Sequence, residues 1–71
     1  MKEYYQVQGS RDGENWAAFR MDGNMYNVTE DLEYARKRYA EMLEFHKTTY
    51  PDVKYHRIVK VKVETEEIER E

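Results

Sequence analysis

The chain has 71 residues, including seven tyrosines and no cysteine, and its formal net charge is −3. A chain of this length forms one small domain, and without cysteine no disulfide can stabilise it. No apolar run approaches the roughly 20 residues that span a bilayer, so we expect no membrane span and a cytoplasmic location. Five glutamates follow Val63, and the four of them within residues 65–71 make this segment an acidic tail behind a domain over residues 1–64.

Three short strands are predicted before any helix. Residues 3–8 and 16–21 alternate between apolar and polar side chains, which is the period of a half-buried strand. Asp22-Gly23 predicts a hairpin turn, because glycine adopts a positive φ at low steric cost. Residues 25–28 then return from this turn as a short third strand.

A single helix follows the strands. We expect Thr29 to cap it, with acidic side chains over residues 30–33 in the first turn, where the helix dipole favours them. Thr48, Thr49 and then Pro51 end it. Residues at spacings of three and four give the helix one mostly apolar face, formed by Leu32, Ala35, Tyr39, Met42, Leu43 and His46.

Residues 53–64 are predicted as the last and longest strand, in which three valines alternate with charged residues. The order strand, strand, strand, helix, strand predicts an α+β fold, with a small antiparallel sheet and one helix packed on one face. The second face of the sheet then has no helix to cover it. Alternation assigns to this face Tyr4, Gln6, Gln8, Trp16, Ala18, Ile58, Lys60 and Lys62.

The uncovered sheet face is the first candidate contact surface, and we expect Tyr4, Trp16, Ile58 and Lys60 to make the contacts. An apolar patch of more than a few hundred Å² seldom faces water without a purpose. The alternative is that the acidic tail or the first loop folds across this face, or that lysine stems screen it.

The far side of the helix is the second candidate contact surface. At about 100° per residue, Tyr34, Arg38, Glu41 and Phe45 are predicted to lie opposite the apolar face, as two rings that flank an ion pair. Aromatic residues and arginine are enriched at interface centres, so Tyr34, Arg38 and Phe45 are also predicted partner-binding residues. The alternative is an ordinary scatter of surface aromatics that Arg38 covers.

Catalytic, metal-binding and cofactor-binding patterns are not found in the sequence. His46 and His56 are the only histidines, and Ser10 is the only serine, with no base near it in sequence. The glycines do not form a strand-to-helix phosphate loop. We therefore expect a protein that is not an enzyme and that has no metal site and no cofactor.

Two family resemblances bear on the partner. Residues 15–18, the pair Asp22-Gly23 and a capped helix resemble the three-stranded DNA-binding domains of the plant AP2 and phage-integrase arm type, over about residues 4 to 43. Those families place several arginines and tryptophans on the sheet, and in this chain only Arg20 and Trp16 correspond to them. The last strand departs from that pattern, so a nucleic-acid-binding sheet is the alternative function.

The whole chain is similar to the short proteins of unknown role that phages and mobile elements encode. This resemblance depends on the tryptophan, the helix, residues 55–59, the valines that follow and the glutamate-rich end. It implies a module that binds and blocks a host protein, including defence proteins. We therefore expect a non-enzymatic protein-binding module, whose partner is a host protein or a second copy in a homodimer.

Overall fold

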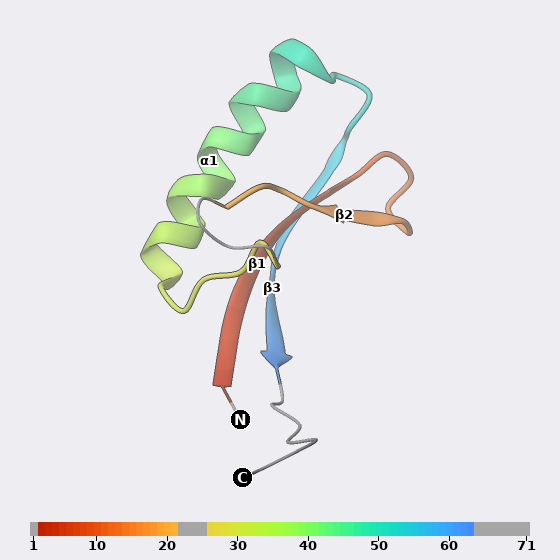
Figure 1. The fold of residues 1–71 in the computed structure, drawn as a ribbon. Coiled ribbons are helices and arrows are strands. Elements are labelled where there is room, and N and C mark those ends of the chain that lie inside the picture. Colours follow the sequence, from red (N-terminus) through yellow and green to blue (C-terminus); the bar gives the residue numbers. More distant parts are fainter. Residues whose placement is uncertain (1, 22–25, 64–71) are drawn as a thin grey trace, which may run out of the picture.

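A computed structural model describes residues 2–21 and 26–63 of the chain. Three strands and one helix follow one another as β1 (Lys2–Ser10), β2 (Trp16–Ala18), α1 (Leu32–Thr49) and β3 (Tyr55–Val63). The strands form one antiparallel sheet in the order β2-β1-β3, with α1 lying against it (Figure 1). The predicted fold class, an α+β fold with one helix on a small antiparallel sheet, is confirmed.

The long central pair of strands forms the base of the fold. β1 and β3 pair along nine residues each, from Lys2 opposite Val63 to Ser10 opposite Tyr55. β2 adds three residues beside the end of β1, where Gln8 lies opposite Ala18. In Figure 1, β1 and β3 continue past the first turn of α1, so the helix covers only part of the ladder.

The predicted second strand is shorter in the structure. It ends at Ala18, and Phe19 leaves the ladder after its backbone N–H donates to the Val7 carbonyl at 2.7 Å. Met21 is then buried with 2% of its surface exposed. The segment from Phe19 to Met21 therefore packs beside the helix and does not continue the sheet.

The predicted third strand lies partly outside the described residues, as does the predicted hairpin at residues 22–23. Within the described part, residues 26–28 form no strand, and Thr29 makes one isolated bridge to Tyr5. Both backbone hydrogen bonds of this bridge form, at 2.7 and 3.0 Å. The tail predicted over residues 65–71 also lies outside the described residues.

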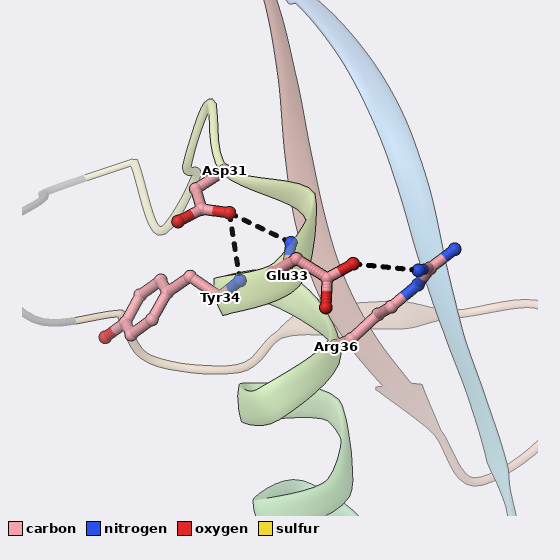
Figure 2. A network of polar contacts seen from close by, with 4 residues as sticks. All are labelled: Asp31, Glu33, Tyr34 and Arg36. Carbon is pink, nitrogen blue, oxygen red and sulfur yellow. Dashed lines mark hydrogen bonds and ion pairs between the residues drawn. The ribbon is translucent and has the colours of Figure 1, made fainter.

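The N-cap of the helix lies two residues later than predicted. Asp31 is the N-cap, and its carboxylate accepts the backbone N–H groups of Glu33 and Tyr34 at 2.9 and 3.2 Å (Figure 2). Glu33 in the first turn pairs with Arg36 at 3.0 Å. The predicted cap, Thr29, instead accepts the Asp31 N–H through its hydroxyl. Asp31 therefore satisfies two of the free donors that begin any helix.

The core lies between α1 and the sheet. Val7, Ala35 and Met42 have 0% of their surface exposed, and Met21 completes the central cluster. Of the residues predicted on the apolar face of the helix, Leu43 is 39% exposed and lies outside this core. No described helix is long and apolar enough to cross a membrane.

Candidate interaction surface

The two faces of the sheet can be assigned from the register and the core. Residues that lie opposite each other in an antiparallel ladder point to the same face. Val7 is fully buried in the core cluster below α1, and Ile58 lies opposite it, so these two define the helix face. On the other face, which we call the open face, the paired residues are Tyr4 with Val61, Gln6 with Val59, and Gln8 with Arg57 and Ala18.

Two predicted contact residues lie on the wrong face of the sheet. Ile58 packs against the core, and Lys60 lies opposite Tyr5 on the helix face, where it also pairs with Glu3 at 3.4 Å. The alternation that we read in the last strand is present, but the valines do not face the helix. Alternation groups residues into two sets, and only the register with β1 decides which set is inside. Lys62, opposite Glu3, is also on the helix face.

The open face retains two predicted contact residues and gains a third. Tyr4 and Trp16 are both partly exposed there. The guanidinium of Arg57 lies over the Trp16 ring, with Cζ 3.9 Å from its centroid. Such a stack contributes about 0.5–1 kcal/mol at an exposed site, so it holds both side chains in place.

A chain of amide hydrogen bonds crosses the same face. Arg57 Nε donates to Gln8 Oε1 at 2.7 Å, and Gln8 Nε2 donates to Gln6 Oε1 at 2.6 Å. Gln6 Nε2 then donates to the Tyr26 carbonyl at 3.0 Å. These bonds orient Arg57 and the two glutamines without burying them. The open face is therefore an ordered surface of Arg57, Trp16, Tyr4, two glutamines and two valines.

The predicted contact stripe on the helix does not face outward as a unit. The Arg38 side chain is only 17% exposed, because its guanidinium lies 4.7 Å over the Phe19 ring and donates to the Arg20 carbonyl at 2.7 Å. Tyr34 packs against the core cluster. Phe45 is 45% exposed but its ring lies 6.1 Å from that of Phe19. Phe45 is therefore exposed as predicted, whereas Arg38 and Tyr34 are partly covered, because Phe19 leaves the sheet and packs beside this flank of α1. Partner binding by these three residues stays a prediction.

A cavity of about 370 Å³ lies at the other end of the helix, and the sequence did not predict it. His46 Nδ1 lies 3.2 Å from His56 Nε2, so one ring donates and the other accepts. Gly9 leaves room for this pair, because a Cβ there would lie 3.1 Å from both His46 and Val53. The cavity is lined by Gly9, Ser10, Arg11, Asp12, Asn15, Ala17, Ala18, Phe19, Met42, His46, Tyr50 and Val53.

The charges around this cavity are already paired. Arg11 and Asp52 form an ion pair, which lowers the pKa of Asp52. Asp12 accepts the backbone N–H groups of Asn15 and Glu14, and these bonds lower the pKa of its carboxyl. Partial burial lowers the pKa of His46, as do the nearby positive charges of His56 and Arg11. These interactions hold the loop after β1 in place.

The side chains around this cavity form no recognisable catalytic or metal-binding group among the described residues. The Ser10 hydroxyl donates to Asp12 at 3.0 Å, so it is engaged within its own loop. Among the described residues, no group of three or more histidine or acidic side chains could hold a metal ion. The open face therefore remains the stronger candidate site. Comparisons of this chain with protein-family models, with curated proteins and with solved structures found no match.

Proposed function

We propose that this chain is a non-enzymatic protein-binding module that contacts its partner with the open face of its sheet. In keeping with the resemblance to short phage-encoded proteins, its role would be to inhibit or regulate the protein it covers. The absence of cysteine fits a cytoplasmic site of action. The observation that carries the proposal is Arg57 stacked on Trp16 on a face that no described helix or strand covers.

The composition of the open face supports a protein partner. Tryptophan, tyrosine and arginine are the residue types that dominate binding energy at protein interfaces. Here the Arg57 side chain is held by the Trp16 ring and by a hydrogen bond to Gln8, so less of its side-chain entropy is lost when a partner binds. The partner should offer apolar side chains to Trp16 and Tyr4, and a carboxylate or carbonyl to Arg57.

A nucleic-acid partner is less well supported by the same geometry. Single-stranded nucleic acid needs a row of cations along its phosphates beside the stacking rings. Lys60 and Lys62 lie on the helix face, which leaves Arg57 as the one lysine or arginine that the described ladder presents beside Trp16. Protein is therefore the partner that we propose.

Affinity capture with matched variants tests this proposal. Trp16→Ala and Arg57→Ala each remove one half of the stack, and exposed Lys37 on α1 provides the control, Lys37→Ala. Removal of an interface centre costs about 2 kcal/mol or more, so capture by each of the first two variants should weaken at least about tenfold. Circular dichroism at each variant's working temperature confirms that it is folded.

If folded Trp16→Ala and Arg57→Ala capture the same proteins as the unaltered chain, in equal yield, the open face is not the binding surface. If the unaltered chain captures no more protein than a resin blank, it is not a binding module under those conditions of expression.

A further inference from the structure

The cavity at the C-terminal end of α1 plays no part in the binding proposed for the open face. Its volume of about 370 Å³ falls in the range of roughly 300–1,000 Å³ that small-molecule sites occupy. Its lining comes from that end of the helix, from β2 and from the loop after β1, and every lining residue belongs to the described part of the chain. A space of this size suits a ligand much smaller than a protein.

Small residues of the sheet create this space. Gly9 of β1 lies opposite Ala17 of β2, so the two positions share the helix face of the sheet. A Cβ on Gly9 would point at His46, and Ala17 carries only a methyl group on the same side. Two residues earlier on this face, Val7 is fully buried in the core. The cavity therefore begins where the side chains of the helix face become small.

Aromatic rings form much of the lining. Phe19, His46 and Tyr50 all line the cavity, and the His46 ring centroid lies 5.9 Å from that of Phe19 and 6.2 Å from that of Tyr50. The contact between His46 Nδ1 and His56 Nε2, at 3.2 Å, holds the His46 ring against β3. The buried Met42 side chain adds apolar surface. This lining favours a flat aromatic ligand, because rings attract one another in edge-to-face and offset arrangements.

The charges beside the cavity leave one carboxylate without a cation. Arg11 and Asp52 neutralise each other in an ion pair. Asp12 accepts the backbone N–H groups of Glu14 and Asn15 at 2.8 Å, but among the described residues it forms no ion pair. These bonds lower the pKa of the Asp12 carboxyl, so it stays negatively charged at neutral pH. The group that this side of the cavity favours is therefore a cation.

A cation in this space can also contact the rings. A cationic group within about 6 Å of a ring centroid is attracted to the face of the ring. Phe19 and Tyr50 line the same cavity as Asp12, so the two attractions act together. Arg11 is the one lysine or arginine in the lining, and its charge is already paired. The lowered pKa of His46 keeps that ring neutral at pH 7, so it does not repel a cation.

We propose that this cavity is a second binding site, which takes a small aromatic amine. The flat ring of the ligand packs against Phe19, His46 and Tyr50, and its protonated amine faces Asp12. The site lies on the helix face of the sheet, whereas the surface proposed for a protein partner is the open face. The inference is therefore independent of the proposed function, and a ligand here leaves the open face free.

Three probes that share one ring system and differ in charge test the site. Tryptamine, indole and indole-3-acetate are each titrated at pH 7 into the isotope-labelled full chain, and amide shifts are followed by two-dimensional NMR. Tryptamine should bind with a Kd of about 1 mM or tighter. It should bind at least about threefold more tightly than indole, because its amine adds an ion pair and a cation–π contact, and indole-3-acetate should bind most weakly. Asp12→Asn should reduce the ratio between the tryptamine and indole affinities.

Substitutions in the lining locate the ligand. Ala17→Leu extends a side chain into the cavity and should abolish binding of all three probes, whereas Ala40→Leu on the exposed side of α1 should leave binding unchanged. Tyr50→Ala removes a half-exposed ring from the lining and should weaken tryptamine binding at least about threefold. The same spectra report whether each variant is folded, so Tyr50→Ala decides the matter if Ala17→Leu is not.

Three results overturn the proposal. The first is the lack of any saturable shift with tryptamine at about 5 mM, which is above the expected Kd. The second is an affinity for indole-3-acetate equal to or tighter than that for tryptamine. The third is unchanged tryptamine binding in folded Ala17→Leu or Tyr50→Ala, because the ligand then lies elsewhere. Partner capture is a separate readout, so failure here leaves the proposed function standing.

Discussion

Two neighbouring residues on α1 give a sharp test of how the helix is oriented. Met42 and Leu43 both belong to the apolar face predicted from spacing, yet Met42 is 0% exposed and Leu43 is 39% exposed. Met42 packs in the cluster with Val7, Met21 and Ala35. Truncation of each to alanine removes a side chain of similar size from the same turn, and only the packing differs.

The expected magnitudes follow from that packing. Because Met42 is fully buried, Met42→Ala should lower the free energy of unfolding by about 2–5 kcal/mol. Leu43→Ala removes a side chain already in partial contact with water and should cost about 1 kcal/mol or less. Alanine's higher helix propensity offsets only a few tenths of a kcal/mol in either case. A domain of this size has a total stability of about 4–10 kcal/mol, so Met42→Ala removes a large part of it.

Urea unfolding followed by circular dichroism measures both values. Met42→Ala should lower the urea midpoint strongly with an unchanged slope, and should lower the thermal midpoint by at least about 8 °C. Leu43→Ala should lie within a few degrees of the unaltered chain. If Leu43→Ala lowers the free energy of unfolding as much as Met42→Ala does, the helix is rotated from the orientation described. The face assignments of the site are then wrong as well.

Two further outcomes are expected. Asp31→Ala should cost about 1 kcal/mol, because the first-turn N–H groups lose their acceptor, whereas Asp31→Asn should retain most of that stability in the same urea assay. The lowered pKa of His46 means that the unfolded chain binds a proton there more readily than the folded one. The corresponding stability is therefore present above the ordinary histidine pKa of about 6.5 and is lost as the pH falls below it. Urea midpoints should decline from pH 7 to pH 5, and His46→Gln should reduce that decline; an identical decline in His46→Gln would refute this assignment.

Local pattern was enough to predict the fold class. The valine alternation in β3 and the spacing of Ala35, Tyr39 and Met42 in α1 each report a period that only one type of element satisfies. The ends of elements were less predictable. Thr29 and Asp31 are both good caps, and the backbone bridge from Thr29 to Tyr5 decides that the helix starts after the later one.

The site was harder to predict because it depends on contacts between distant segments. Nothing in the spacing of Ile58, Lys60 and Arg57 tells which of them lies opposite Val7, so the faces of β3 were exchanged. Likewise, the route of residues 19–21 beside α1 is set by burial of Met21 and by the bond from Phe19 to Val7, neither of which is local. Tyr4 and Trp16 were assigned to the same face, and the register agrees, since Trp16 lies opposite Ser10 and Tyr4 and Ser10 are an even number of residues apart on β1.

The alternation of faces along β1 separates two kinds of constraint within one short stretch. Tyr5 and Val7 pack in the core, whereas Tyr4 and Gln6, one step away, lie on the open face that we propose as the binding surface. Relatives of this chain should therefore vary more at Tyr4 and Gln6 than at Tyr5 and Val7, if the open face is the binding surface. A lineage could in this way acquire a new target without rebuilding its interior.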